Sequence, residues 1–263
     1  MPHKILYTAD LHGNPEYYKK LIKKAKDAEI KAVVLGGDLC PKSAGTLGQA
    51  INYQKEFLKD FFIPELSKLK KDIFFIMGND DFRVNESIFA NNENLKYINK
   101  KRFNLFSKNV VGYSFVNPTP FRLKDWEKFD DNKKETPQQL HEYEIRTVKR
   151  EEGTIKEDLQ NFIKLSNPKK TVYAIHAPPF STKLDIIASG SHVGSRAIRA
   201  FIEKEQPYLT LHGHIHESPQ MSGSYIDKIG NTICINVGSS YPENKLACII
   251  IDLDNLDLKY MEL

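Results

Sequence analysis

The sequence predicts an α/β protein built as a four-layer α/β/β/α sandwich, in which two mixed sheets face each other and helices lie outside. In the first half, short apolar strands alternate with amphipathic helices, a pattern typical of a parallel sheet joined by right-handed crossovers. Strands expected at 171–175 and 208–211 continue this alternation, whereas those at 232–237 and 246–263 should be antiparallel. The 263 residues can bury a sizeable core, and we expect one domain over 1–263.

The elements of the first half follow from local residue patterns. A buried strand over 4–9 precedes a helix over 15–27, and Pro15 suits the first helical position because its ring presets φ. Apolar residues then recur with helical spacing at Tyr18, Leu21, Ile22 and Ala25. Two further strands at 31–35 and 72–77 flank a helix over 49–69 that should be interrupted at Pro64.

The pattern changes after the third strand. Short alternating segments over 95–117 resemble hairpins at a sheet edge, and the following residues are irregular. We therefore expect an irregular excursion at about 91–134. Residues 136–165 return to a charged helical pattern that breaks near Gly153, and a further helix is expected over 195–205.

Composition and charge describe an ordinary globular protein, with 40% hydrophobic and 27% charged residues. The net charge of +4 permits an anionic partner such as nucleic acid but does not indicate one.

No apolar run reaches the length of about 18 residues that a membrane span needs, and the chain begins directly with a strand. The three cysteines are widely spaced, which is typical of free thiols in a reducing compartment. We expect a cytoplasmic protein without a membrane partner, and nothing here indicates its oligomeric state.

Five short motifs follow one another along the chain, each where a predicted strand ends. They are Asp10-Leu11-His12, Gly37-Asp38, Gly78-Asn79-Asp80-Asp81, His176, and Gly213-His214-Ile215-His216. Among their side chains are two carboxylates, one amide and four imidazoles that form the ligand set of a two-metal hydrolytic site. Because ligands gather at the carboxyl ends of strands in an open α/β sheet, these side chains should meet. Gly37 and Gly78 each precede a ligand, where a close backbone approach would leave no room for a side chain.

The spacing within the motifs suits chelation. Asp10 and His12 are two residues apart, so in an extended chain both side chains project to the same side, and His214 and His216 repeat this arrangement. Mixed oxygen and nitrogen ligands suit Mn, Fe, Co, Ni or Zn rather than Ca, and we favour Mn. A carboxylate that bridges two ions must lie between the other ligands, and Asp38 is the natural candidate.

As a set, the motifs resemble the calcineurin-like metallophosphoesterase superfamily, whose pattern is D-x-H, G-D, G-N-H-[DE], a lone His and G-H-x-H. The resemblance runs from residue 10 to residue 216. The second half resembles more narrowly the Icc-related branch, in the stretches 176–185, 190–195, 213–218 and 235–239. The resemblance implies the fold of that superfamily, one ion held by Asp10, His12, Asp38 and His216, and another held by Asp38, Asn79, His176 and His214.

The same resemblance implies a phosphoesterase that depends on a dinuclear metal centre. Two ions about 3.5–4 Å apart would activate a bridging hydroxide for in-line attack on phosphorus. They would also neutralise the phosphoryl oxygens as charge develops in the transition state. No protein nucleophile is needed, so no covalent phospho-enzyme is expected. The implied substrate is a small phosphorylated or nucleotide-like ester.

One position departs from the family pattern, because Asp80 stands where the superfamily usually has a histidine. An aspartate beside two dications should be ionised and would be a poor proton donor. It would repel a monoester dianion more than a diester monoanion. We therefore expect a phosphodiesterase, with a small-metabolite phosphomonoesterase as the alternative, and count Asp80 as a candidate catalytic residue. Asp80 could instead only accept hydrogen bonds beside the site.

Other polar residues near the motifs have two interpretations each. His192 is a candidate for catalysis and substrate binding, because its loop leads into a helix whose backbone N–H groups, with Ser195, would suit an anion. It could instead be a surface histidine that caps the helix. Asn14 is a candidate for substrate contact or for capping the next helix. Asn79 is a candidate for both metal and substrate contact, and His212 should pack on the other face of its strand.

Three other functions fit the sequence less well than phosphoester hydrolysis of small molecules. A nuclease would need a basic groove with stacking aromatic residues, and the Lys and Tyr residues form no clear interleaved patch. A non-catalytic binding protein would not need every proposed ligand, and all of them are present. A protein phosphatase of this superfamily carries Asp-Arg-Gly after the second motif, where this chain has Asp38-Leu-Cys-Pro-Lys42.

Overall fold

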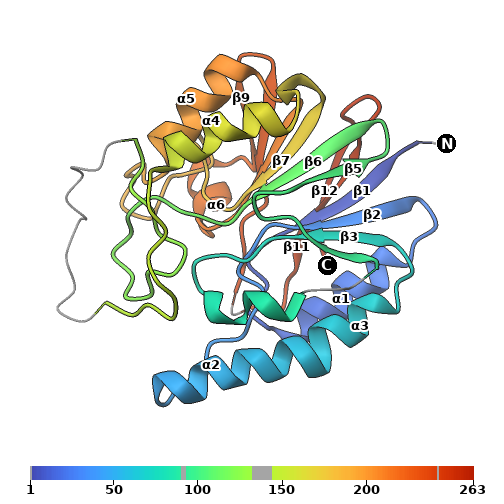
Figure 1. Ribbon diagram of the computed structural model, residues 1–263. Helices are drawn as coiled ribbons and strands as arrows, with labels where there is room; N and C mark the ends of the chain where they lie inside the picture. The colour runs from blue at the N-terminus through green and yellow to red at the C-terminus, as the bar shows by residue number, and fades with distance from the viewer. Residues whose placement is uncertain (1, 90–92, 132–143, 242) are drawn as a thin grey trace.

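The computed structural model describes residues 2–89, 93–131, 144–241 and 243–263. Two six-stranded sheets pack face to face, and helices lie on the outer face of each sheet (Figure 1). This is the four-layer α/β/β/α arrangement that the sequence predicts. Within the described residues, no helix combines the length and the apolar character that crossing a membrane requires.

The first sheet combines strands from both ends of the chain, in the order β12-β11-β1-β2-β3-β4. Its parallel strands are β1 (Lys4–Thr8), β2 (Ile30–Leu35), β3 (Asp72–Phe75) and β4 (Leu95–Tyr97). The antiparallel strands are β11 (Ala247–Asp252), beside β1, and β12 (Leu258–Glu262) at the edge. The parallel strands end at a common edge, which is where the first three motifs lie.

The second sheet has the order β5-β6-β7-β8-β10-β9. Its parallel strands are β6 (Lys108–Tyr113), β7 (Thr171–Ile175), β8 (Leu209–His212) and β10 (Thr232–Asn236). The antiparallel edge strands are β5 (Arg102–Leu105) and β9 (Ile226–Ile229). The strand expected at 232–237 therefore pairs in parallel with β8, and its antiparallel partner is β9, which the sequence analysis missed.

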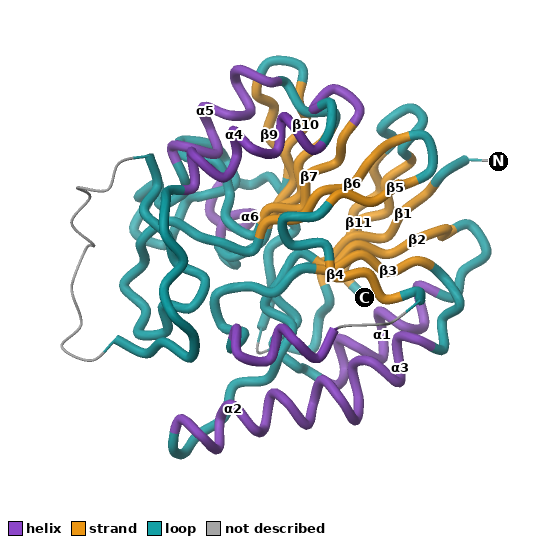
Figure 2. The backbone as a smooth tube through the Cα atoms, viewed as in Figure 1, coloured by secondary structure: helices purple, strands orange, loops and turns teal. Residues whose placement is uncertain are grey.

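The helices cover the two sheets from opposite sides, as the tube in Figure 2 also shows. Against the first sheet lie α1 (Pro15–Ala25), α2 (Leu47–Glu56), a π-helix over Phe57–Phe62 and α3 (Ile63–Ser67). Against the second lie α4 (Ile155–Leu165) and α5 (Arg196–Glu205). The shorter helices are α6 (Ser218–Ser222) and two 3-10 turns over Arg83–Phe89 and Pro168–Lys170.

The interruption predicted at Pro64 takes the form of the π-helix just before it. Proline has no N–H to donate, and its ring would clash with the carbonyl of Asp60, four residues earlier. Widening the helix by one residue per turn over 57–62 separates these groups without ending the helix. The chain therefore continues into α3 in nearly the same direction.

The core between the sheets fixes how the two sets of motifs meet. Alternate residues of β1 point to opposite faces, so Ile5 and Tyr7 lie between the sheets while Leu6 packs beneath the helices. Burying a large apolar side chain contributes about 1.5–3 kcal/mol. The hydroxyl of Tyr7 also donates a 2.6 Å hydrogen bond to the carbonyl of His212 in the other sheet. The strand ends that carry the motifs are thereby held against each other.

The irregular excursion is narrower than the sequence indicates. Residues 95–113 contribute β4, β5 and β6 to the sheets, so the irregular part begins after Tyr113. The helix expected over 136–165 is confirmed only from Ile155 onward; residues 144–154 are not helical, and 132–143 lie outside the described residues. The capping box of Thr154 starts the helix there, and Thr147 before it bonds through its backbone N–H and its hydroxyl to the buried carboxylate of Asp125.

Candidate metal centre

All seven predicted metal ligands lie in loops that directly follow strands. The loops after β1, β2 and β3 carry Asp10, His12, Asp38 and Asn79, and the loops after β7 and β8 carry His176, His214 and His216. The first sheet thus supplies the oxygen ligands and one imidazole, and the second sheet supplies three imidazoles. A site of this kind exists only when both sheets are in place.

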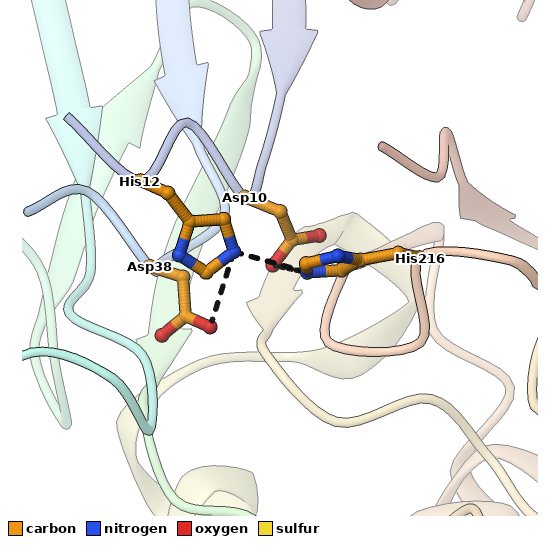
Figure 3. A group of neighbouring side chains, drawn as sticks. All are labelled: Asp10, His12, Asp38 and His216. Atoms are coloured by element: carbon orange, nitrogen blue, oxygen red, sulfur yellow. Dashed lines mark hydrogen bonds and ion pairs between the residues drawn. The ribbon is translucent and has the colours of Figure 1, made fainter. Parts of the chain in front are cut away.

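Four of these side chains converge as one group. Asp10, His12, Asp38 and His216 each present an atom within 4.8 Å of the atoms of the other three (Figure 3). His12 Nε2 lies 3.1 Å from His216 Nε2 and 3.9 Å from Asp38 Oδ2. The group therefore has the composition and spacing of a divalent-metal site.

A second group adjoins the first through Asp38. Asn79 Oδ1 lies 3.1 Å from His176 Nε2 and 2.5 Å from His214 Nδ1, and His176 Nε2 lies 3.5 Å from Asp38 Oδ2. The Nδ1–H of His176 donates to the carbonyl of Gly36, which leaves Nε2 free to face the centre, as a metal ligand requires. The structure thus brings all seven side chains together, with Asp38 between the two groups. Their role as metal ligands stays a prediction.

The backbone at several of these residues is strained. Asp10, His12, Asp38 and His214 have φ angles of 57°, 44°, 51° and 68°, in the left-handed region that non-glycine residues rarely adopt. Each such residue costs about 1 kcal/mol or more. Strain of this kind persists only where the surroundings hold it, and it clusters at functional sites.

Glycines make room for the ligands, as expected. A Cβ atom at Gly37 would lie 2.6 Å from His176 Nδ1, and one at Gly78 would lie 2.6 Å from His176 Nε2. A Cβ at Gly213 would lie 2.7 Å from Asp10 Oδ2. Any larger residue at these positions would displace a predicted ligand, so the donor set and its supports fit a bound metal.

The charges of the cluster also fit a bound metal ion. Burial disfavours ionised Asp10 and Asp38, but His216 and His176 outweigh burial and lower the pKa of both carboxyls. Burial alone would lower the pKa of His176, yet the charge of Asp38 raises it to about 9. In the metal-free protein, imidazolium protons thus balance buried carboxylates, and a divalent cation would take over that charge.

Asp81 holds the second and third motifs together, a role that the sequence analysis missed. Its buried carboxylate accepts hydrogen bonds from the backbone N–H groups of Gly78, Leu39 and Cys40 at 2.9, 3.0 and 2.8 Å. Burial, followed by the nearby charge of Asp38, raises the pKa of Asp81 to about 7. The only signal in the sequence is its place at the acidic end of the Gly-Asn motif.

Asp80 lies at the edge of the cluster and is paired with Lys42. Its Oδ2 lies 2.7 Å from Lys42 Nζ and 3.5 Å from His12 Nδ1, and its backbone N–H donates to Asp38. Burial and then Asp38 raise the pKa of Asp80 against the opposing effect of Lys42. Lys42, four residues after Asp38, was missed as a site residue because nothing local to it marks it. Lys42 therefore places a cation beside Asp80, where the sequence predicts only a negative charge.

His192 lies beside a cavity that reaches the candidate metal centre. Its Nδ1 lies 2.7 Å from Oδ1 of Asp185, a buried carboxylate that also accepts backbone hydrogen bonds from Thr182 and Gly194. The cavity, about 650 Å³, is lined by both His192 and His214. The following helix is capped by Ser195 and not by His192, so the alternative interpretation of His192 as a helix cap is wrong. Its predicted contact with substrate stays a prediction.

The substrate contact predicted for Ser195 is wrong for this structure. Ser195 is fully buried, and its hydroxyl donates to Asp130 and accepts from the N–H of Ile198, so it caps α5. The carboxylate of Asp130 also accepts from the N–H of Arg196 at 2.6 Å. The helix terminus that was expected to meet a substrate anion is therefore already occupied by a carboxylate of the chain.

Two other positions resolve in favour of structural roles. Asn14 caps α1, because its side-chain oxygen accepts from the N–H groups of Glu16 and Tyr17 at 2.9 and 3.3 Å, and its contact with substrate stays a prediction. His212 is buried on the other face of its strand, as expected, where its Nδ1–H donates to the carbonyl of Ala177. Burial lowers the pKa of His212 to about 4, so it stays neutral.

The family follows from a comparison with known protein families. The model of the family described as calcineurin-like phosphoesterase matches residues 3–218, which include all five motifs. The chain belongs to the calcineurin-like phosphoesterase family. Membership makes it a metal-dependent hydrolase of phosphate esters, and the clustered Asp and His side chains could bind metal accordingly.

Solved structures share this fold over the length of the chain. One crystal structure has a TM-score of 0.68 at 16% identity and covers 100% of this chain and 99% of its own. That of the protein TT1561 from Thermus thermophilus has a TM-score of 0.61 at 17% identity, with the same coverage. Such identities show the fold alone. An archaeal phosphodiesterase, with a TM-score of 0.45, 14% identity and 99% coverage of each chain, is too dissimilar to support an argument. Curated proteins gave no match.

Proposed function

We propose that this calcineurin-like phosphoesterase hydrolyses a phosphodiester of a small or nucleotide-like molecule. The observation that carries the proposal is the pair of adjoining ligand groups that share Asp38, with Asp80 and Lys42 at their edge. When bound, two divalent ions, with Mn favoured over Fe, Co, Ni and Zn, would supply Lewis acidity and an activated water. Asp10, His12, Asp38 and His216 would hold one ion, and Asp38, Asn79, His176 and His214 the other.

The other residues around the cluster orient substrate and balance charge. Asp80 places a carboxylate beside the phosphoryl site, which a diester with one negative charge tolerates better than a monoester with two. Lys42 offsets part of this repulsion because its ammonium lies 2.7 Å from Asp80 Oδ2. His192, held by Asp185 at the neighbouring cavity, is positioned to donate a proton to a leaving group there.

The alternative is a phosphomonoesterase, and Lys42 is the observation that favours it. If the ammonium turned from Asp80 toward the substrate, it would attract the second charge of a monoester. A diesterase requires that the negative charge of Asp80 dominates at this edge of the centre, whereas a monoesterase requires that the positive charge of Lys42 dominates. Asp80 is mostly buried and its backbone is bonded to Asp38, whereas the side chain of Lys42 is 57% exposed. The fixed charge is the negative one, which supports the diesterase.

The decisive experiment compares an aryl phosphodiester with the matching aryl monoester under each candidate metal. We expect the diester to be hydrolysed faster, and a monoester preference of about tenfold or more, near 1.4 kcal/mol, would contradict the proposal. Asp38→Asn should remove nearly all activity and lower the metal content found by elemental analysis. Asp254→Asn, which alters a carboxylate paired with His3 and far from the motifs, is the matched control.

The metal requirement is tested on its own with the unmodified protein. We expect a chelator to abolish activity and the favoured metal to restore it. Full activity in chelator, together with no bound transition metal in elemental analysis, would refute the mechanism.

A further inference from the structure

We propose that the cavity beside His214 binds an aromatic ester arm of the substrate, with Phe121 as the surface on which the ring lies. This inference rests on the proposed function, because it assigns a place to one of the two substituents of a phosphodiester. It concerns the irregular segment after β6, which carries Phe121 and packs against the loops of the second sheet.

The cavity adjoins the candidate metal centre at His214. Its volume is about 650 Å³, and its walls include His214, one of the predicted ligands, and His192. A substituent of a phosphate held at the centre would lie beside this cavity on the side of His214. Its size falls within the range of small-molecule sites, which is about 300–1,000 Å³.

The lining of the cavity is suited to an apolar, planar group. Phe121, Phe180, Ile187 and Pro118 contribute to its walls. Phe121 is 50% exposed, although most large apolar side chains of this chain are buried. Its ring stands edge-on to that of His214, with the centroids 6.2 Å apart and the planes at 87°. One face of an aromatic side chain is thus held in place beside a predicted ligand and is open to solvent.

A second planar surface lies in the same cavity. The guanidinium of Arg196 stacks over the ring of Phe180 at 3.9 Å from its centroid, and both residues line the walls. Rigid aromatic and guanidinium faces favour a flat ring over an aliphatic group of similar size, because stacked rings gain beyond the area that they bury. These planar surfaces therefore favour an aromatic arm over an aliphatic arm of similar size.

A second cavity borders the candidate metal centre at His216. Its volume is about 860 Å³, and it is lined by His216, by the tyrosines Tyr225, Tyr241 and Tyr260, and by polar residues such as Gln220, Glu243 and Lys245. Glu217 lines both cavities. A phosphodiester held at the ligands would have room for its second arm in this cavity, so the assignment of the aromatic arm rests on the cavity beside His214 alone.

The test uses two phosphonate monoesters that differ in one ring. Monomethyl phenylphosphonate and monomethyl cyclohexylphosphonate have the same charge and similar size, but only the first is planar. Their dissociation constants from the manganese-loaded protein are measured by titration calorimetry. We expect the phenyl compound to bind about threefold to tenfold more tightly, the range typical of one aromatic contact.

Variants of Phe121 locate the source of this preference. Phe121→Ala and Phe121→Leu should bring the ratio of the two constants close to one, and Phe121→Trp should retain it. Phe121→Leu keeps apolar bulk, so it separates stacking from hydrophobic burial. The matched control is Phe106→Ala, because Phe106 is also an exposed phenylalanine but stacks on His3 at the opposite ends of the strands. It should leave the ratio unchanged.

The outcomes separate this inference from the proposed function. Equal binding of the two compounds, binding of neither, or a preference that survives in Phe121→Leu overturns the aromatic cavity. Turnover of bis(4-nitrophenyl) phosphate is followed in the same preparations. If turnover is absent while a preference that depends on Phe121 is present, the proposed function fails and the cavity assignment stands. Turnover without a preference for the phenyl compound would support the proposed function and overturn the aromatic cavity.

Discussion

At the scale of single residues, the edge of the metal centre is governed by the ion pair of Lys42 and Asp80. Asp80 alone would add a negative charge where a phosphoryl group should bind. Lys42 reaches it from the loop after Asp38, with its Nζ 2.7 Å from the carboxylate. Burial opposes the charge of Lys42, but the attraction of Asp80 raises its pKa, so Lys42 stays a cation at neutral pH.

We predict that Lys42→Ala lowers kcat/KM for a monoester by about fivefold to tenfold more than for the matching diester. The reason is that the ammonium offsets repulsion that grows with the charge of the substrate. Lys42→Arg should restore most of the loss. Asp80→His should have the opposite effect and raise the monoester rate relative to the diester rate.

The control for Lys42 is Lys68→Ala, which breaks an exposed ion pair with Glu65 on α3. It should change neither rate. A Lys42→Ala variant that lowered both rates equally would show that the ammonium acts on binding in general and not on the charge of the substrate.

The second residue prediction concerns His192. His192→Ala should lower kcat/KM with unchanged metal content, by about a hundredfold for diesters with poor leaving groups and much less for good ones. Only a poor leaving group needs a proton in the transition state. Steady-state rates over a series of leaving groups measure this difference.

The matched control for His192 is His3→Ala, because His3 also pairs with a carboxylate, that of Asp254, but far from the motifs. Equal activity of His192→Ala on every ester, together with a small loss of stability, would assign a purely structural role to this imidazole.

At the scale of elements, the irregular segments 114–131 and 144–154 are anchored by an ion network. Lys128 is 1% exposed and bonds Glu151 at 3.0 Å and Asp158 of α4 at 2.7 Å. Arg83, at the start of a 3-10 turn, also reaches Glu151 at 2.7 Å. A buried ammonium is tolerated only with such partners, so the network fixes the segment that carries Phe121.

This network predicts a pH-dependent stability. Burial disfavours ionised Glu151, but Lys100 and Lys128 outweigh burial and lower its pKa from 4.5 to about 2. The folded pKa lies below the unfolded one, so the contribution to the free energy of unfolding is fully present above about pH 4.5 and is lost as the pH falls through about 2. We expect Glu151→Gln to cost about 1–2 kcal/mol at pH 7, after allowance for solvent screening, and little near pH 2.

Urea unfolding of both proteins at several pH values measures this difference. Glu203→Gln, which alters an exposed pair with Arg199, is the control and should cost much less at every pH. A cost for Glu151→Gln that did not change with pH would show that packing, and not charge, explains it.

The elements also show where sequence reasoning reaches its limit. Buried strands and capped helices, such as β1 and α5, are encoded by adjacent residues, and their positions were predicted within two residues. The role of Ser195 was not, because it depends on Asp130, 65 residues away in the chain. The charged pattern of 144–154 predicts a helix, whereas the hydrogen bond from Thr147 to the carboxylate of Asp125, 22 residues away, is invisible in the sequence.

The candidate site also has a part that the sequence predicts and a part that it does not. Motifs at strand ends identified the side chains that converge, since the ends of parallel strands must meet. The pairing of Lys42 with Asp80, and the exposed ring of Phe121, depend on how loops fold over the site. No repeating pattern in the sequence marks either one.

At the scale of the whole molecule, the ligand cluster joins the two sheets. The carboxylate of Asp10, after β1, accepts hydrogen bonds at 3.1 Å from the N–H of His214, after β8. We propose that residues 1–263 form one domain for this reason. A ligand that binds the folded state stabilises all of it, so bound metal should raise the melting temperature of both sheets together.

We predict that metal binding releases protons. His176 has a pKa of about 9 in the metal-free protein, because Asp38 outweighs burial, so it carries a proton at pH 7–8 that a metal ion must displace. The apparent affinity should therefore rise with pH until about pH 9. Calorimetric titration in buffers with different ionisation enthalpies counts the released protons.

In Asp38→Asn, His176 loses the charge that raises its pKa, so fewer protons should be released per ion bound, although less metal binds to this variant. Two separate melting transitions, only one of which responds to metal, would contradict a single cooperative unit. Metal binding without any proton release would contradict the charge balance described for the cluster.

The left-handed backbone at Asp10, His12, Asp38 and His214 has a consequence for how quickly the centre can be loaded. We expect the burial of the two sheets, and not the ion, to impose these conformations during folding. The ligands are therefore preorganised, and an incoming ion has only to displace protons and water. We expect the metal-free and metal-loaded proteins to have the same backbone at these four positions, so that loading is limited by dehydration of the ion and not by movement of the chain.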